Sequence, residues 1–247
     1  MQVLTFDFHN TLVHCDPWFE LEVRTLPRAV ARRLGLAPAL TDDTIDAAYR
    51  DLRRNVIATG IEINAVDGVS AVFSRLGVAT TATAVLDTID DLMREAQASV
   101  APVDGAVDSV RALRELGIPL GVISSAVHHD TLTWSLEHIG IDDCFDVIVS
   151  SASCGHYKST PAIYAHTLAA MGGTAGRSVH VGDSLKWDVT VSREAGMYPV
   201  WLQTTHRETF SQGLPTSEPV LTLQTLAGAG PTLANLLRQI LAAGTHV

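Results

Sequence analysis

The stretch Val3–Phe19, VLTFDFHNTLVHCDPWF, places one carboxylate, Asp7, among apolar and β-favouring residues. Such a run predicts a buried β-strand, and burial of a carboxylate is costly unless another group requires it there. His9, Asn10 and Thr11 follow directly. We therefore expect a strand that brings an acid and a histidine into a turn, and the rest of the chain must show which chemistry needs them.

Four further runs rich in β-branched and apolar residues follow, and amphipathic stretches separate them. Alternating strands and helices predict a parallel sheet covered on both faces, and strands covered on both faces are nearly all apolar. We predict an α/β fold with a Rossmann-like core and a strand order close to 3-2-1-4-5. The expected strands are Val3–Phe8, Leu120–Ser125, Val147–Ser151, Ser178–Asp183 and Pro199–Gln203.

The interval between residues 16 and 100 shows helical patterns and no convincing strand. An all-helical insertion after the first strand predicts a second domain over the carboxyl ends of the strands, where open α/β sheets bind ligands. We expect residues 1–15 and 101–247 to form the core and residues 16–100 to form a helical cap domain. Near the end of the chain, residues 204–219 predict a surface loop and residues 231–241 a closing helix.

The composition is that of an ordinary soluble globular protein, with 247 residues, 47% hydrophobic and 18% charged. A formal net charge of −10 argues against nucleic acid as a partner. The sequence shows no apolar run long enough to span a bilayer and, near Met1, no basic segment followed by an apolar stretch, so we expect neither a membrane partner nor a secretory signal. The cysteines, Cys15, Cys144 and Cys154, cannot all pair and form no C-x-x-C motif, so we expect a cytoplasmic location.

Polar side chains gather at the ends of the predicted strands and before one helix. The carboxyl ends of parallel strands meet at one edge of the sheet, so these groups would form one site. Two carboxylates at neighbouring strand ends suit Mg²⁺, and a carboxylate can also act as a nucleophile toward phosphorus. The candidate residues are Asp7, His9, Thr11, Ser124, Ser125, Lys158, Asp183 and Asp188.

In these residues the chain resembles the haloacid-dehalogenase superfamily of hydrolases, whose four motifs can all be placed on it. The resemblance implies a Mg²⁺-dependent phosphatase that acts on a small phosphorylated metabolite and has a Rossmann-like core with a helical cap. The first motif, Asp-x-Asp-Gly-Thr, corresponds to Asp7–Thr11. The serine or threonine of the second motif corresponds to Ser124, and the lysine of the third corresponds to Lys158. The fourth motif, Gly-Asp…Asp, corresponds to Gly182-Asp183 and Asp188.

The resemblance also implies a role for each residue. Asp7 would attack phosphorus and form a phosphoaspartate. Mg²⁺ would be held by Asp7, by Asp183 and by the backbone carbonyl of His9. Ser124 and Lys158 would neutralise the phosphoryl oxygens. Thr11 and Ser125 would assist in phosphate binding, and Asp188 would support the lysine or a metal-bound water.

His9 departs from the family pattern, because phosphatases of the family usually carry a second aspartate there. That aspartate protonates the leaving group and later activates water. Imidazole can do the same work with a pKa near neutrality instead of about 4, and such help is worth roughly 10²–10⁴-fold. Three uses of His9 therefore stay open: acid/base catalysis, shaping of the substrate site, or loss of catalysis. Asn10 replaces a glycine, and asparagine tolerates left-handed backbone angles.

Two alternatives to the phosphatase stay open. A 2-haloacid dehalogenase, with Asp7 attacking carbon, would also have a ring two places after the nucleophile, but dehalogenases usually lack an aspartate at the position of Asp183. A non-catalytic binding protein would keep the fold and lose turnover through His9. The phosphonate-cleaving branch needs a cap lysine, and both lysines, Lys158 and Lys186, lie elsewhere. We expect the chain to be a monomer or a homodimer.

Several other residues are assigned structural roles. We expect one solvated helix face to carry Arg50, Arg53 and Arg54. Trp18 and Phe19 are expected in the apolar core of the cap, although they follow the first motif closely enough to touch a substrate.

Overall fold

The centre of the protein is a six-stranded sheet in which every neighbouring pair is parallel. The computed structural model describes residues 1–36, 40–204 and 217–244. The predicted order is confirmed for the first five strands, and a sixth short strand, which the sequence does not predict, extends one edge. In spatial order the strands are β5 (Val147–Ser150), β4 (Leu120–Ser124), β1 (Leu4–Phe6), β6 (Val179–Gly182), β7 (Tyr198–Leu202) and β8 (Leu221–Leu223).

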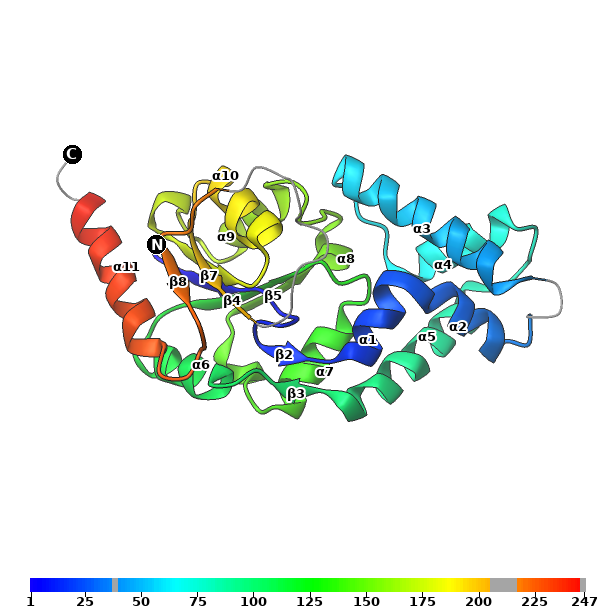
Figure 1. Cartoon of the computed structure of the whole chain (residues 1–247), viewed down its shortest axis with the longest axis horizontal. Helices are drawn as coiled ribbons and strands as arrows, with labels where there is room; N and C mark the ends of the chain where they lie inside the picture. The colour runs from blue at the N-terminus through cyan, green and yellow to red at the C-terminus, as the bar shows by residue number, and fades with distance from the viewer. Residues whose placement is uncertain (37–39, 205–216, 245–247) are drawn as a thin grey trace.

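Helices cover both faces of this sheet (Figure 1). Side chains along a strand alternate between the faces, so Leu4 and Phe6 pack in one hydrophobic core and Val3 packs in the other. The first core contains residues of α6 (Ala106–Glu115), α7 (Asp130–His138) and α11 (Gly230–Gly244). The second contains residues of α9 (Ala162–Ala170) and η6 (Leu185–Val191), and the short helix α10 (Ser192–Glu194) follows η6. The shorter elements are η4 (Asp142–Cys144), α8 (Ser151–Cys154) and η5 (Ala175–Arg177).

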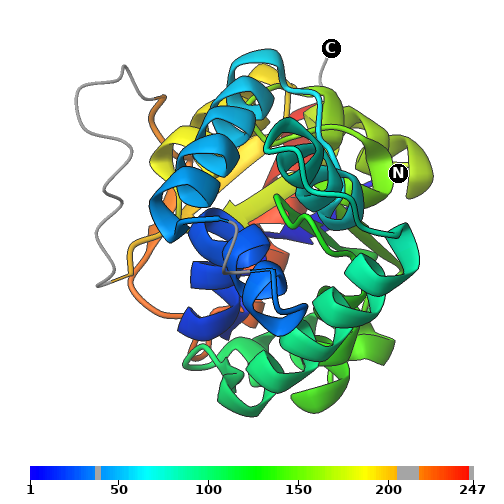
Figure 2. The ribbon, with the colours of Figure 1, turned by 90° about the vertical axis from the view of Figure 1, so that its right-hand side faces the viewer.

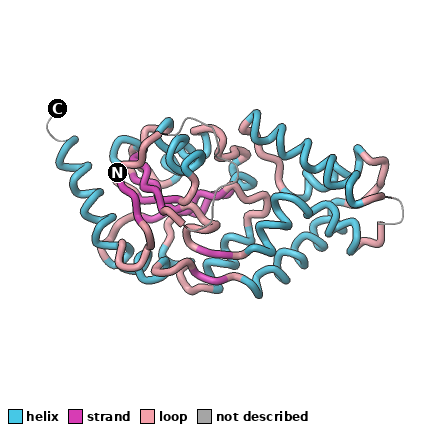
Figure 3. Tube along the Cα trace, in the orientation of Figure 1, coloured by secondary structure: helices cyan, strands magenta, loops and turns pink. Residues whose placement is uncertain are grey.

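Residues 16–99, called the helical segment below, lie between β2 (Val13–His14) and β3 (Ala101–Pro102). Figure 3 shows strands in one half of the molecule and this segment in the other, and Figure 2 shows its helices in front of the sheet. Its division from the core as a separate domain stays a prediction. Its elements are α1 (Asp16–Glu20), the π-helix η1 (Leu21–Thr25), α2 (Leu26–Arg33), α3 (Asp42–Thr59), α4 (Ala65–Arg75), α5 (Ala82–Ala96) and η3 (Gln97–Ser99).

Local sequence explains where these helices begin and end. Thr41, Asn64 and Thr81 each accept a backbone N–H in the first turn of the helix that follows, which satisfies a donor that the helix itself leaves free. Helix α3 ends at Gly60, whose φ of 71° is readily adopted only by glycine. A Cβ on Gly60 would also collide with the side chain of Thr160, so glycine lets α3 approach the core closely.

The two chain crossings between the core and the helical segment lie side by side. Val13 pairs with Pro102 and His14 pairs with Ala101 in a two-residue antiparallel ladder. The chain therefore leaves the core and returns to it at one place.

Two further expectations concern the rest of the chain. The closing helix is confirmed as α11. The expected surface loop at residues 204–219 lies largely outside the described residues. Among the described residues, no helix is both long and apolar enough to cross a membrane.

Candidate active site

Asp7 stands directly after β1, at the carboxyl edge of the sheet. A tight turn follows, in which the backbone N–H of Leu12 bonds to the carbonyl oxygen of Phe8 over 2.8 Å. Asn10 adopts a φ of 62° in this turn, as predicted from its replacement of glycine. Thr11 Oγ1 donates a hydrogen bond of 3.1 Å to Asp7 Oδ2, so the turn itself holds the candidate nucleophile.

Lys158 joins two buried carboxylates. Its Nζ lies 2.5 Å from Asp7 Oδ1 and 2.7 Å from Asp188 Oδ1. All three residues are almost excluded from solvent, with 2% of Lys158, 9% of Asp7 and 1% of Asp188 exposed. The sequence placed Lys158 and Asp188 in different motifs 30 residues apart, and the fold brings them into contact.

His180 of β6 extends this network, although the sequence analysis gave it no role. Its Nε2 lies 3.1 Å from Asp188 Oδ1 and its Nδ1 lies 2.9 Å from Thr5 Oγ1. The backbone N–H of Ser184 donates to Asp188 Oδ2. A Cβ on Gly182 would lie 2.3 Å from the carboxylate carbon of Asp188, so only glycine leaves room there. Asp7, Lys158, Asp188 and His180 are called the strand-end cluster below.

The charges of the strand-end cluster depend on burial and on mutual contact. Burial raises the pKa of Asp7 to about 6, although Lys158 opposes the rise. Burial also acts to raise the pKa of Asp188, but Lys158 and the hydrogen bond from His180 outweigh it and lower that pKa. Burial opposes charge on Lys158, yet Asp188 and Asp7 raise its pKa. Burial lowers the pKa of His180, so we infer a neutral imidazole that donates to Asp188 through Nε2.

The carboxylates fit a cation site. Ligand oxygens of Asp7, Asp183 and Asp188 all lie within 4.8 Å of one another. Such a group of carboxylate oxygens suits a hard divalent cation such as Mg²⁺, and the assignment of the cation to Asp7 and Asp183 stays a prediction.

The predicted phosphate-binding serines lie at the neighbouring strand end. Ser124 is the last residue of β4, which pairs with β1, and only 4% of it is exposed. Ser125 follows and hydrogen-bonds to the hydroxyl of Tyr157, the residue before Lys158. The fold therefore brings both serines to the edge that carries Asp7, and their roles in phosphate binding stay predictions.

His9 faces the start of the helical segment. The backbone N–H of Cys15 donates to its Nε2 over 3.4 Å. Its ring stacks on Phe19, with centroids 4.6 Å apart and planes 4° apart, and meets the ring of Trp18 at 5.3 Å. Trp18 is buried as expected, whereas Phe19 is 37% exposed. His9 therefore connects the turn after β1 with α1, and its acid/base role stays a prediction.

A second group of buried charges, which the sequence analysis missed, joins the helical segment to the core. Arg53 bonds to both carboxylate oxygens of Glu62, at 2.5 and 3.2 Å. Ser151 Oγ donates to Glu62 Oε2 over 2.6 Å, and the Arg53 guanidinium lies 5.4 Å from the ring centroid of Tyr157. The prediction that Arg53 lies on a solvated helix face is therefore wrong. Arg53 pairs with Glu62, and Ser151, which is 89 positions further along the chain, hydrogen-bonds to that glutamate in the folded protein.

Glu22 of η1 belongs to the same group. Its Oε1 accepts the backbone N–H of Val127 over 2.9 Å, and its carbonyl oxygen accepts the hydroxyl of Tyr49 over 2.7 Å. Burial raises the pKa of Glu22 to about 8, with Arg53 acting in the opposite direction. Glu22, Tyr49, Arg53, Glu62 and Tyr157 are called the interface cluster below.

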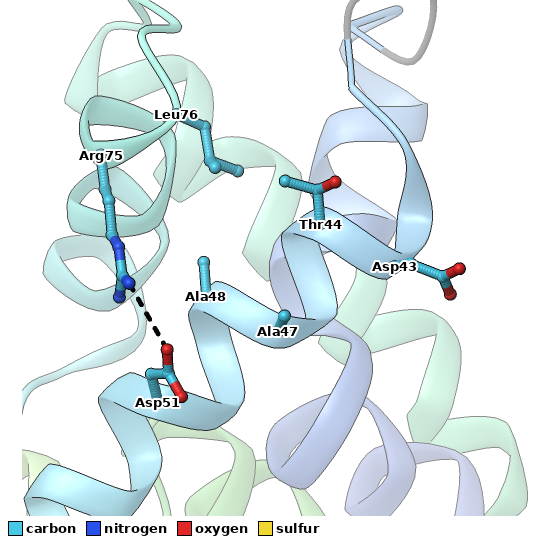
Figure 4. Close-up of a pocket in the computed structure, with 7 residues that line it drawn as sticks. All are labelled: Asp43, Thr44, Ala47, Ala48, Asp51, Arg75 and Leu76. Carbon is cyan, nitrogen blue, oxygen red and sulfur yellow. Dashed lines mark hydrogen bonds and ion pairs between the residues drawn. The ribbon is translucent and has the colours of Figure 1, made fainter.

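Two surface hollows lie away from the strand-end cluster. The larger, of about 390 Å³, lies between α3 and α4, where Arg75 bonds to Asp51 over 3.4 Å (Figure 4). The smaller, of about 190 Å³, is lined by Asn64 and the start of α4 and by the loop that leads into α7, including His129. Neither hollow is lined by a predicted site residue.

The motif order, the sheet and the strand-end cluster all agree with one class of enzyme. A family model described as haloacid dehalogenase-like hydrolase matches residues 1–196 of the chain. The protein belongs to the haloacid dehalogenase-like hydrolases.

Relatives and solved structures extend this result. A glyceraldehyde 3-phosphate phosphatase of Methanopyrus kandleri is 25% identical over 81% of this chain and 83% of that protein. A protein of the same name from Pyrococcus abyssi is 32% identical, but the match covers only 41% of this chain and 42% of the relative. The chain thus spans less than half the length of some of the curated relatives that it matches.

Two crystal structures support the fold. An HAD phosphatase from Thermococcus onnurineus has a TM-score of 0.61 and 21% identity, over 94% of this chain and 98% of the other. A 2-haloacid dehalogenase from Pseudomonas syringae pv. Tomato has a TM-score of 0.64 and 18% identity, over 96% and 99%. The same architecture therefore accompanies two different reactions, and the choice between them rests on the site.

Proposed function

We propose that this hydrolase is a Mg²⁺-dependent phosphatase that acts on a small phosphorylated molecule through a phosphoaspartate on Asp7. The observation that carries the proposal is the pairing of Asp7 with Asp183 beside a buried lysine. A dehalogenase attacks carbon and needs no metal-binding aspartate, whereas phosphoryl transfer needs charge neutralisation around the phosphoryl oxygens. The name of the two relatives, glyceraldehyde 3-phosphate phosphatase, also favours a small phosphate ester.

The proposed first step is attack by a carboxylate oxygen of Asp7 on phosphorus. The bond from phosphorus to the leaving oxygen breaks, and that oxygen takes a proton from His9. Lys158 and Ser124 neutralise the phosphoryl oxygens, while Thr11 keeps the carboxylate in place. Mg²⁺, held by Asp7, Asp183 and the His9 carbonyl, would supply further neutralisation of charge.

The proposed second step is hydrolysis of the phosphoaspartate. His9 removes a proton from water, whose oxygen bonds to phosphorus as the bond to Asp7 breaks, releasing inorganic phosphate. In the present arrangement His9 Nε2 accepts a hydrogen bond from Cys15, so a neutral His9 carries its proton on Nδ1. To donate a proton to the leaving oxygen, His9 must first be an imidazolium protonated on both nitrogens, and in that form it releases the Cys15 N–H. Donation then restores the neutral imidazole, which can take the proton from water in the second step.

We also propose that residues 16–100 act as a cap domain over this site. His9 contacts α1 through two rings, and Glu22 of η1 bonds to the backbone after β4. A covering segment that excludes water would strengthen every charge interaction beneath it.

The test is release of inorganic phosphate from a panel of phosphorylated metabolites, with Mg²⁺ or with a chelator. We expect metal-dependent release that falls by at least about 10³-fold in Asp7→Asn, because the nucleophile is lost. Asp108→Asn, which changes an exposed aspartate of α6, is the matched control and should retain activity. Halide release from 2-haloacids without Mg²⁺, and no phosphate release, would instead establish a dehalogenase.

The role of His9 has its own test. His9→Asp should retain turnover and shift its pH dependence toward acid, because a carboxyl group has the lower pKa. His9→Ala should lose roughly 10²-fold or more in kcat. Equal rates in the wild type and both variants would exclude His9 as the acid/base.

A further inference from the structure

The first turns of the helical segment cover the two strand ends that carry the chemistry. The ring of Trp18 meets the ring of Phe8, in the turn after β1, at a centroid distance of 5.5 Å. One turn further on, Glu22 Oε1 accepts the N–H of Val127, in the loop after β4. Strands β1 and β4 are neighbours in the sheet. The Trp18–Glu22 face therefore spans the ends of the strands that position Asp7 and Ser124.

Two polar atoms on this face have no hydrogen-bond partner among the described residues. They are Trp18 Nε1 and Glu22 Oε2, and both are buried. Only 3% of Trp18 and 5% of Glu22 is exposed, so solvent does not satisfy them. Nearly all buried polar groups in proteins have partners, because an unsatisfied one costs the energy of its desolvation. Two such atoms on one face over a catalytic edge suggest that a ligand supplies the missing bonds.

We propose that Trp18 Nε1 and Glu22 Oε2 form a subsite that binds a hydroxyl or carbonyl oxygen in the neutral leaving group of a phosphorylated polyol or sugar. This inference rests on the proposed phosphatase function and names the class of its substrate. Trp18 supplies an N–H donor, and the carboxyl of Glu22 supplies either an O–H donor or an acceptor. Hydroxyl groups can pair with both.

The charges around the subsite disfavour a carboxylate on the leaving group. Arg53 faces Glu22 from α3, but Glu62 already binds its guanidinium through two oxygens. Tyr49 and Tyr157 add only hydroxyl groups to the cluster. Burial keeps Glu22 protonated at neutral pH, since its pKa is raised to about 8, and Arg53 is already engaged by Glu62, so the interface cluster does not offset the desolvation of a ligand carboxylate. The subsite therefore discriminates between a CH₂OH group and a carboxylate at the same position.

The experiment compares equilibrium binding of glycerol 3-phosphate and 3-phosphoglycerate, which differ only by that replacement. Calorimetry on Asp7→Asn with Mg²⁺ at pH 7 avoids turnover. We expect glycerol 3-phosphate to bind at least about tenfold more tightly than 3-phosphoglycerate. Trp18→Phe keeps an aromatic ring and removes the N–H, and Glu22→Leu removes the carboxyl. Each should weaken glycerol 3-phosphate binding by about tenfold, the effect of one hydrogen bond, with unchanged circular dichroism.

Two further variants make the result specific. Glu22→Gln keeps a donor at the second side-chain position and should bind glycerol 3-phosphate within about threefold of the parent. Glu20→Gln changes an exposed carboxylate two residues away, which pairs with Arg24, and should change nothing. Equal binding of the two ligands in every variant, or binding of neither, would overturn the subsite. The phosphatase proposal is judged separately, by phosphate release from the wild type.

Discussion

The two buried charge clusters of this protein differ in how completely they are satisfied. In the strand-end cluster, Asp188 has partners on both oxygens, from Lys158, His180 and the Ser184 N–H. Asp7 likewise meets Lys158 on one oxygen and Thr11 on the other. In the interface cluster, Glu62 is equally well bound, but Glu22 keeps one oxygen without a partner among the described residues.

This difference separates carboxylates whose two oxygens are both hydrogen-bonded from a carboxyl group that can still accept a bond from a ligand. A buried charge that is fully hydrogen-bonded is held in one position, as catalysis of phosphoryl transfer requires. A buried carboxyl with an open oxygen is costly alone and gains stability when a ligand arrives. The following predictions test the contrast, beginning with the largest expected effect.

Removal of Lys158 should damage the strand-end cluster most severely. Lys158→Met leaves the carboxylates of Asp7 and Asp188 buried without their cation, so we expect a loss of about 5 kcal/mol in unfolding free energy. Phosphatase activity should fall by about 10³-fold or more. Urea denaturation and phosphate release measure the two effects. Lys186→Met is the matched control, since Lys186 is the other lysine and lies over the ring of Trp187; a similar loss there would contradict the prediction.

Removal of Arg53 should have a smaller effect on the interface cluster. Arg53→Met leaves Glu62 buried with Ser151 and one backbone N–H as partners, and we expect a loss of about 3 kcal/mol in unfolding free energy. Its neighbour Arg54 is exposed and pairs with Asp51, so Arg54→Met should cost less than about 0.5 kcal/mol. If the two variants unfold at the same urea concentration, the buried pair contributes nothing measurable.

Glu22 should make stability depend on pH. Its pKa is about 8 in the folded protein and 4.5 in the absence of burial, so the folded state keeps a proton that the unfolded state releases. The stabilisation is full below pH 4.5 and is lost as pH rises toward 8, at about 1.4 kcal/mol per pH unit. Glu22→Gln does not titrate, so as the pH rises from 5 to 7 the wild type should lose about 2–3 kcal/mol in unfolding free energy relative to this variant. Parallel denaturation midpoints for the two proteins across this range would refute the assignment.

His180 should have the smallest effect of the four. His180→Phe keeps a ring beside Tyr164 but removes the hydrogen bond to Asp188, while Lys158 and Ser184 remain. We expect a loss of about 1 kcal/mol in stability and a fall in kcat of up to about tenfold, because Lys158 is positioned through Asp188. His180→Gln, which can still donate, should recover part of kcat. Unchanged kcat in His180→Phe would show that the imidazole only fills space.

The sequence predicted the fold well because its signals are local. Apolar runs and glycine-terminated helices depend on neighbours along the chain, and they located five of the six strands. The order of those strands was expected from the doubly wound topology that alternating strands and helices favour. The missing strand, Leu221–Leu223, is three residues long and is formed by pairing with β7, which no local pattern shows. The candidate site residues also meet at one edge, because parallel strands end there.

The charged partners were harder to predict because they depend on distant contacts. Arg53 follows a helical pattern typical of solvated residues, and only the fold brings Glu62 and Ser151 together around it. His180 left a signal that was not used: it is a histidine inside an otherwise apolar strand, VHVG, that is covered on both faces. Glu22 left no signal, since a glutamate on a short helix is ordinarily solvated.

The paired crossings β2 and β3 have a mechanical consequence. The ladder of Val13 with Pro102 forms a narrow ribbon between the two parts of the molecule. The bonds of Glu22 to Val127 and of Glu62 to Ser151 are made elsewhere, with the loop after β4 and with the start of α8. A rotation about the ribbon would separate both glutamates from the core and leave the ladder intact. The ribbon would then act as a hinge, and the contacts of the interface cluster would hold the helical segment closed over a bound substrate.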